Sequence, residues 1–340
     1  MGPEAGLILG ELTTLRVGGP AASVVTAATR DELVDAALST WAAGDDWLVL
    51  GGGSNVVIGD EGFDGTVIRV ATRGIERLPG DGVLLRVEAG EPWDGLVAHT
   101  VAQGWSGIEA LSGIPGSSGA APIQNIGAYG QELSDVLVAV EFLDFLTGDR
   151  QRIPAADLGL GYRTSSIKAG RSGIVLAIEL RLRETADSVI RYPQLASALG
   201  VESAPVAQIR AGVLALRAAK GMVLDPADPD SVSCGSFFTN PIVSENFARG
   251  LPAETPQWLV DDVDVKLSAA WLIEQAGITK GFRLPGSRVA ISSKHTLAIT
   301  NRGGGTAEEV GELSRYIRAM VLSRFGVALQ PEPVAVGVLL

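Results

Sequence analysis

Three side chains in this sequence could carry a charge or a proton in a reaction. Arg163 lies beside small hydroxyl residues, and its planar guanidinium suits two-pronged recognition of a carboxylate or phosphate. Ser236 precedes two phenylalanines that would desolvate its hydroxyl, and Glu332 is held between two prolines that stiffen its backbone. Taken alone, the arginine is better explained as a surface residue and the serine as part of a strand edge. For the glutamate, a rigid turn is as good an explanation as catalysis.

A glycine-rich segment follows the short apolar run at residues 47–50. It consists of Gly51, Gly52, Gly53, Ser54 and Asn55. Successive backbone N–H groups in such a turn can form a concave nest for an anion such as a pyrophosphate. The segment matches neither the dinucleotide-binding fingerprint nor the Walker loop. Taken alone, an ordinary glycine turn explains it equally well.

A second segment, residues 114–130, is more informative. It is uncharged and built largely of small residues, whereas a loop of this length usually carries charge to stay solvated. Long ordered loops are usually functional. We expect its backbone amides to wrap a large, flat ligand, with Gln124 and Asn125 supplying directional contacts.

Alternating strands and helices must position these segments. The first part of the chain predicts a helix beginning at the capping box Thr29–Glu32 and strands over 47–50 and 66–70. The middle part predicts half-buried strands and one helix with Pro92 at its first position, ending near Gly104. The expected strands of this part are 83–88, 136–144 and 174–182.

The last third follows a proline- and aspartate-rich break at residues 225–233, where we place a domain boundary. A helix is expected over 269–275, closed by Gly277. A second capping box at Thr306–Glu309 begins a longer helix that ends at Gly326, and a strand-like tail covers 334–339.

Composition excludes several classes of function. The net charge of −12 argues against sequence-independent binding of nucleic acid, which needs a basic surface. A single cysteine, Cys234, excludes an internal disulfide framework, and two histidines make a nitrogen–sulfur metal site very unfavourable. We see neither a signal peptide nor a membrane span, so we expect a cytoplasmic protein.

Seven segments, in order along nearly the whole chain, resemble the UDP-N-acetylenolpyruvoylglucosamine reductase (MurB) family in its longer form. No single segment decides the resemblance, but seven in the right order are highly specific. They are residues 12–19, 51–55, 114–130, 161–165, 235–241, 266–277 and 330–333.

The resemblance implies an α+β, three-domain FAD-binding reductase. Residues 1–70, completed by 327–340, would form the first flavin-binding domain, and 71–224 the second. Residues 225–326 would form the smaller, α+β substrate domain. The FAD would be bound without a covalent link, and NADPH would reduce it.

The reaction implied by the resemblance is hydride delivery to the enolpyruvyl group of the UDP-sugar, giving UDP-N-acetylmuramate for peptidoglycan synthesis. Arg163 would stabilise the developing negative charge, Glu332 would share a proton near the carboxylate, and Ser236 would protonate the carbanion-like carbon. No metal is implied, and we expect a monomer without nucleic-acid or membrane partners.

The resemblance also carries over binding positions. The substrate would contact Tyr192, Lys220, Asn240 and His295. The FAD would contact residues 51–55 and, in the second segment, Ile114, Pro115, Gly116, Gly119, Ala120, Pro122, Gln124, Asn125, Gly127, Ala128, Tyr129 and Gly130.

Two departures and two rival functions stay open. Many members read Glu-Pro-Glu-Val where this chain has Gln330-Pro331-Glu332-Pro333. Thr255 stands where some members have a tyrosine before the proline, and Trp258 would take over the substrate contact of that tyrosine. One rival is an oxidase or dehydrogenase that shares the flavin fold. The other is a non-catalytic protein that binds a sugar nucleotide.

Overall fold

A computed structural model describes residues 4–340, which form two compact units. The first unit contains residues 4–7, 21–53 and 64–223, and the second contains 8–20, 54–63 and 224–340. Each unit is therefore assembled from separate parts of the sequence. The three-domain division stays a prediction.

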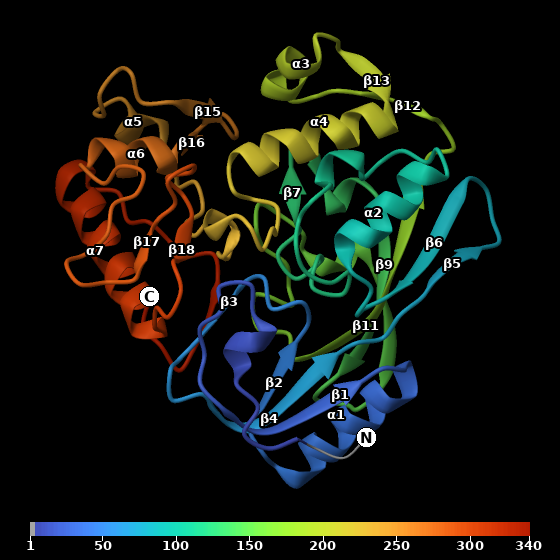
Figure 1. The fold of residues 1–340 in the computed structure, drawn as a ribbon. Helices are drawn as coiled ribbons and strands as arrows, with labels where there is room; N and C mark the ends of the chain where they lie inside the picture. Colours follow the sequence, from blue (N-terminus) through green and yellow to red (C-terminus); the bar gives the residue numbers. More distant parts are fainter. Residues whose placement is uncertain (1–3) are drawn as a thin grey trace. The chain divides into compact units, whose positions relative to one another are not determined.

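One layer of the first unit is a three-stranded sheet with a helix beside it (Figure 1). Its strands, in the order β1-β4-β2, are β1 (Ala21–Ala27), β4 (Phe63–Val70) and β2 (Trp47–Leu50), of which β2 and β4 are parallel. Helix α1 (Arg30–Ala43) begins at the predicted capping box and ends at Gly44, whose φ is +74°. Both strands and the helix predicted for this region are confirmed.

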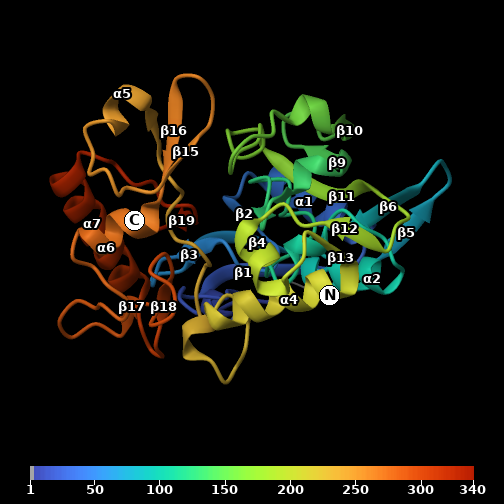
Figure 2. The same ribbon diagram turned by 90° about the horizontal axis from the view of Figure 1, so that it is seen from above.

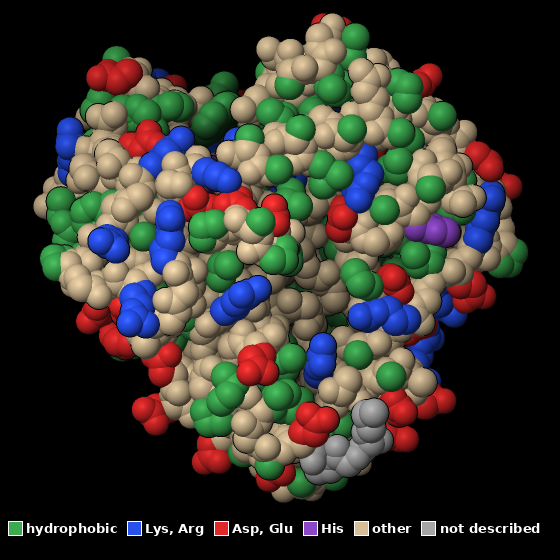
Figure 3. Space-filling model, viewed as in Figure 1, with side chains coloured by type: hydrophobic (Ala, Val, Ile, Leu, Met, Phe, Trp, Pro, Cys, Tyr) green, Lys and Arg blue, Asp and Glu red, His purple; other side chains and the backbone are tan. Residues whose placement is uncertain are grey.

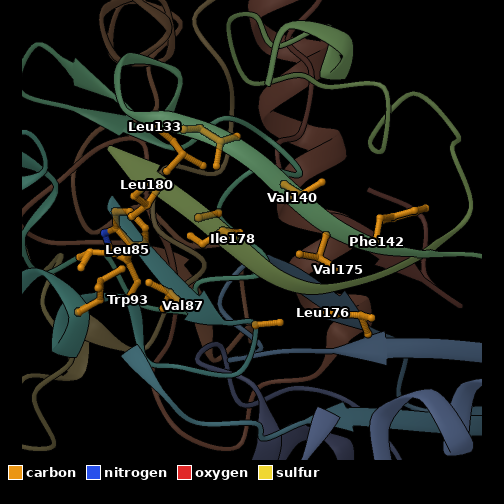
Figure 4. Packing of buried hydrophobic residues seen from close by; sticks show 14 of the residues in the cluster. Leu85, Val87, Trp93, Leu133, Val140, Phe142, Val175, Leu176, Ile178 and Leu180 are labelled. Carbon is orange, nitrogen blue, oxygen red and sulfur yellow. The ribbon is translucent and has the colours of Figure 1, made fainter. Parts of the chain in front are cut away.

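The core of the first unit lies on an antiparallel five-stranded sheet in the order β10-β9-β11-β6-β5. The strands are β5 (Ile75–Leu78), β6 (Val83–Glu88), β9 (Leu137–Asp144), β10 (Arg150–Pro154) and β11 (Gly173–Leu182). Almost every side chain of the central strand β11 is buried. Figure 4 shows Leu85, Val140, Ile178 and Leu180 of this sheet packed with Trp93. The three strands predicted here are confirmed to within a residue.

Three helices complete the first unit: α2 (Trp93–Ala102), α3 (Pro193–Leu199) and α4 (Val206–Ala219). Helices α2 and α4 lie side by side (Figures 1 and 2). Pro92 is the N-cap of α2 and not its first residue, so the predicted position was wrong by one. The smaller strands are β7 (Gly127–Ala128), β8 (Gln131–Glu132), β12 (Asp187–Val189) and β13 (Ser203–Pro205).

The second unit packs helices and short strands around its own apolar core. Its helices are α5 (Glu245–Ala248), α6 (Ala269–Gln275) and α7 (Ala307–Phe325). Its strands are β3 (Val56–Ile58), β14 (Ile242–Ser244), β15 (Gln257–Leu259), β16 (Asp264–Leu267), β17 (Val289–Ile291), β18 (Ile299–Asn301) and β19 (Val334–Val336). Helices α6 and α7 lie beside each other in both ribbon views.

Long-range pairing completes the second unit. Strand β19 pairs in parallel with β3, so the end of the chain is joined to residues 56–58. The capping box at Thr306 and the αL glycine at 326 bound α7 as predicted. The strand expected over 334–339 is shorter and ends at Val336, one residue before Gly337, whose φ is +65°.

The surface carries charges of both signs. Figure 3 shows lysine and arginine side chains interspersed with acidic ones on the visible face. Within residues 4–340, no helix combines the length and apolar composition needed to cross a bilayer.

Candidate active site

The two glycine-rich segments of the first unit touch one another. A Cβ built at Gly52 would lie 2.7 Å from the Gly116 Cα, and one at Gly51 would overlap the Ser117 hydroxyl. A Cβ at Gly119 would lie 2.5 Å from the Ala89 Cβ. Only glycine allows these backbones to approach so closely. Gly53, with φ +60°, completes the turn in a left-handed conformation.

Residues 116–119 run beside residues 89–93 and are fixed by backbone hydrogen bonds. Trp93 N donates to Gly116 O at 3.0 Å, and Gly119 N donates to Ala89 O at 2.8 Å. Ser118 is fully buried, and its hydroxyl has no hydrogen-bond partner within the described residues. Ile114 packs against the core, Ala120 and Gln124 are half-buried, and Pro122 is buried. Pro115 is half-buried as well. Much of the segment at residues 114–130 is thus held against residues 89–93 and the core of the first unit.

Three residues of this region adopt left-handed backbone conformations without being glycine. Asn125 has φ +44°, Tyr129 has φ +49° and Arg163 has φ +54°. Such conformations are uncommon for tyrosine and arginine and persist only where surrounding contacts enforce them. They therefore mark 125–130 and 161–165 as segments whose shape is imposed by the fold.

Asn125 supplies many of these contacts. Its side chain is 1% exposed, and its Nδ2 donates to Glu132 Oε2 at 3.0 Å and to Gly161 O at 3.1 Å. Its Oδ1 accepts from Ser134 N at 2.9 Å. The amide was predicted to contact the cofactor directly. In the structure these atoms brace the loop against the protein, and the contact with the cofactor stays a prediction.

Arg163 fixes the same loop from the neighbouring segment. Its Nη2 donates to Gly127 O at 2.6 Å and its Nη1 to Asn125 O at 3.3 Å. Ser165 donates to Ile123 O at 2.6 Å. The two segments singled out independently in the sequence are thus joined, with a permanently charged guanidinium at their junction.

The start of the loop is tied to α2 and α4 by a carboxylate that the sequence reasoning missed. Asp94 accepts from Gly113 N at 2.6 Å and, in a two-pronged pair, from Arg210 at 2.6 and 2.8 Å. Burial alone would raise the pKa of Asp94, but the hydrogen bonds from Arg210 and Gly113 outweigh it and hold the pKa below its ordinary value. Asp94 and Arg210 are 116 positions apart in the sequence, so no local pattern could have revealed the pair.

The end of the loop contacts Tyr192 and Lys220, which the sequence assigned to substrate binding, and Lys220 in turn contacts Gln194. The rings of Tyr129 and Tyr192 make an edge-to-face contact with centroids 5.4 Å apart. Lys220 lies over the Tyr129 ring at 5.8 Å and donates to Gln194 Oε1 at 3.1 Å. Burial raises the pKa of Tyr129, against an opposing effect of Arg217. Two of the predicted substrate positions, Tyr192 and Lys220, thus share one cluster with a predicted cofactor position.

Ser236 and Glu332 belong to the second unit, where their segments are hydrogen-bonded to each other. Glu332 N donates to Phe237 O at 2.9 Å, and Thr239 N donates to Gln330 O at 3.1 Å. Both side chains are half-buried, whereas Phe237 and its neighbour Phe238 are almost fully buried. The two candidate acids are therefore carried by two segments that are hydrogen-bonded to each other.

The last residue of the first glycine-rich segment, Asn55, also reaches Glu332. Ser54 and Asn55 belong to the second unit and are half-buried. Asn55 Nδ2 donates to Glu332 O at 3.4 Å, and Asn55 O accepts from Val334 N at 3.0 Å.

Asn240 and His295 lie elsewhere in the second unit. Asn240 Oδ1 accepts from Ala269 N at 3.0 Å, at the first residue of α6. His295 lies in the turn between β17 and β18, where its backbone N–H donates to the Ser292 hydroxyl at 3.2 Å. Their assignment to substrate stays a prediction, as do the assignments of the other site residues.

Comparison with known proteins matches both parts of the chain. Residues 226–336 match the family described as UDP-N-acetylenolpyruvoylglucosamine reductase, C-terminal domain, and residues 21–153 match the FAD binding domain family. The glycine cradle, the uncharged loop and the buried Ser118 hydroxyl agree with a flavin nucleotide as the ligand of this region.

Several relatives match over nearly the full length. Proteins named UDP-N-acetylenolpyruvoylglucosamine reductase from Leifsonia xyli subsp. xyli and Salinispora arenicola are 54% and 50% identical, covering 98% of this chain and 98% and 96% of theirs. The crystal structure of the reductase (MurB) from Thermus caldophilus matches with a TM-score of 0.68 at 30% identity, covering 98% of this chain and 99% of its own. The chain belongs to the UDP-N-acetylenolpyruvoylglucosamine reductase family of oxidoreductases.

Proposed function

We propose that this protein reduces UDP-N-acetylglucosamine enolpyruvate to UDP-N-acetylmuramate, with NADPH as electron donor, in the synthesis of peptidoglycan precursors. Family membership supports the reaction class. The observation that supports it most directly is the backbone hydrogen bond from Glu332 N to Phe237 O, which joins the segments that carry Ser236 and Glu332.

Bound FAD would supply the redox chemistry, accepting a hydride from NADPH and passing it to the substrate. Residues 51–53 and 114–130 would hold it, through backbone groups at the glycines that tolerate no Cβ. Asn125, Arg163 and Asp94 would keep that cradle in shape before the cofactor arrives.

Arg163 would stabilise charge on the substrate. Hydride addition at the terminal carbon of the enolpyruvyl group pushes an electron pair toward the carboxylate as an enolate. A fixed cation lowers the barrier because its orientation is already set by the Gly127 and Asn125 carbonyls.

Ser236 and Glu332 would manage the proton. The enolic carbon is strongly basic, so a serine hydroxyl held in a half-buried position can protonate it despite its high pKa. Glu332 would act near the substrate carboxylate as a group that shares a proton.

Lys220 would provide the local positive charge that a nucleotide diphosphate needs in a protein of net charge −12. Tyr192, adjoining it through Tyr129, would pack against the nucleotide. Asn240 and His295 would contact the sugar side of the substrate.

The test separates the two half-reactions. The purified protein is freed of oxygen, and its visible flavin absorbance is followed as NADPH and then the enolpyruvyl sugar nucleotide are added. We expect NADPH to bleach the flavin band and the sugar nucleotide to restore it. A flavin that is reduced by a simple alcohol and not by NADPH would favour the oxidase alternative. Failure to bind FAD, even on reconstitution, would favour a non-catalytic binding protein.

A further inference from the structure

A hollow of about 370 Å³ lies in the first unit, beside the end of β11 and the start of β12. It is lined in part by Ser106, Gln131, Arg181, Arg183 and Arg191. None of these residues has a role in the reaction proposed above. Three arginines around one hollow are notable in a chain that has 27 basic and 39 acidic residues, because basic groups are the minority.

Strand geometry places two of the arginines and the serine on one face. Ser106 and Arg183 form an antiparallel bridge, with hydrogen bonds of 2.9 Å in both directions between their backbones. Directly paired residues point their side chains to the same side of a sheet. Arg181 is two residues before Arg183 and shares that side, whereas the intervening Leu182 is buried.

The arginines are only partly used by the protein. Arg181 donates to Asp81 O at 3.2 Å, and Arg191 lies 3.8 Å from Asp135 Oδ2, too far for a hydrogen bond. Within residues 4–340, the Arg183 guanidinium makes no ion pair. Asp135 and Asp187 also line the hollow, so the three cations outnumber the two carboxylates.

Ser106 provides a second, independent observation. Its side chain is 1% exposed, and its hydroxyl has no hydrogen-bond partner within the described residues. Buried hydroxyls are nearly always hydrogen-bonded, so an unpartnered one on the wall of a hollow requires an acceptor or donor from outside the chain.

We propose that this hollow binds an oxyanion of the phosphate class. A tetrahedral dianion offers acceptor oxygens in several directions, which suits separate guanidinium groups and one hydroxyl better than it suits a single carboxylate. The anion is bound by Arg183 and Ser106, with Arg181 and Arg191 at the rim.

The hollow is connected to the loop at residues 114–130. Gln131 lines it and donates to Glu109 Oε1 at 2.8 Å, and Glu109 Oε2 accepts from Gly107 N at 2.6 Å. At the other side, a Cβ built on Gly130 would lie 2.9 Å from the Arg191 Cβ. Occupancy by an anion therefore fixes residues that directly follow the loop and precede Tyr192.

The test is calorimetric titration of the FAD-loaded protein with inorganic phosphate at constant ionic strength, with saturating UDP present to occupy the proposed nucleotide positions. We expect one phosphate per chain. Arg183→Gln should weaken its affinity about tenfold or more, because a charge-assisted hydrogen bond is lost. Ser106→Ala should weaken it by a smaller factor.

Arg249→Gln is the matched control. It removes the same charge from an exposed residue of the second unit, and the phosphate affinity should not change. Absence of phosphate binding by the wild type, or equal affinities for the wild type and Arg183→Gln, would overturn the proposal.

Titration with adenosine 2′-monophosphate distinguishes the source of the anion. Binding that is tighter than that of inorganic phosphate, and that is lost in Arg183→Gln, assigns the site to the phosphoryl group of a nucleotide. Equal or weaker binding assigns it to free phosphate. The FAD absorption band and thermal unfolding of each variant confirm that the protein remains folded.

Discussion

Ser236 owes its position to the backbone on both sides. Gly235 has φ +75°, and the following residue, Phe237, is held from two directions by Leu297 O and Glu332 N. The hydroxyl therefore stays in place without depending on its own hydrogen bonds, and its removal should disturb little else.

We predict that Ser236→Ala keeps the NADPH-driven reduction of flavin and loses reduction of the sugar nucleotide. The second half-reaction should slow by about 10²–10⁴-fold, the usual contribution of a positioned proton donor. Stopped-flow absorbance measures both halves separately. A comparable loss in both would mean that the serine matters for folding or flavin binding.

Cys234 lies two residues before Ser236 and is a buried free cysteine. Its side chain is 7% exposed, its thiol donates to Val56 O at 3.4 Å, and burial raises its pKa to about 12. We predict that the native protein does not react with a disulfide reagent at pH 8, whereas the denatured protein titrates one thiol. Rapid reaction of the native protein would contradict this burial.

At the scale of elements, α4 braces both ends of the loop. Arg210 and Arg217 of α4 and its C-cap residue Lys220 recur at helical spacing, and they lie beside Asp94, Gly113 and Tyr129 respectively. Arg217 also donates to Met222 O at 2.8 Å, which ties the end of α4 to the segment that follows. One helix thus sets the distance between the start and the end of the proposed cofactor loop.

We predict that Asp94→Asn weakens FAD binding about fivefold, or by about 1 kcal/mol, because the carboxylate is 40% exposed and partly screened. Fluorescence titration of the FAD-free protein measures this affinity. Asp94→Glu, which keeps the charge, should restore part of it. Asp31→Asn, which removes from α1 an exposed carboxylate that pairs with Arg150 of β10, is the control that should leave the FAD affinity unchanged.

The same carboxylate should contribute to acid unfolding. The pKa of Asp94 is lowered in the folded state, so the folded protein binds fewer protons there than the unfolded chain does. Its stabilisation is therefore fully present above the ordinary aspartate pKa of about 3.9 and is lost as the pH falls through the folded-state pKa.

The free energy of unfolding in urea, measured at several pH values between about 3 and about 6, gives this contribution. We predict that the stability difference between the wild type and Asp94→Asn is constant in the upper part of the range and shrinks toward the acidic end. A difference that does not vary with pH would show that the pair contributes no linked stability.

At the scale of the whole molecule, the sequence predicted local elements well because their signals are local. The strand at residues 83–88 alternates, and both capping boxes place a threonine and a glutamate three residues apart. The two-unit grouping could not be read in the same way, because residues 8–20 and 54–63 join residues 224–340 through pairings of distant segments.

The sequence indicated which residues belong to the candidate site, but not the contacts that hold them. Resemblance to a family selected Arg163, Ser236 and Glu332, and the structure joins the segments of the last two. The left-handed backbone of Tyr129 and Arg163 and the pairing of Asp94 with Arg210 left no local signal, since they arise from tertiary contacts. Asn125 was selected as a cofactor contact, which stays a prediction, and the structure adds that its side chain braces the loop.

The parallel pairing of β3 with β19 has a consequence during synthesis on the ribosome. Strand β3 is fully buried in the finished protein, yet its partner is made only near the end of the chain. At about 5–20 residues per second, β3 waits for roughly tens of seconds as an apolar strand without its neighbour. Such an edge invites pairing with other chains. The second unit therefore completes its folding last, although two of its three segments emerge early.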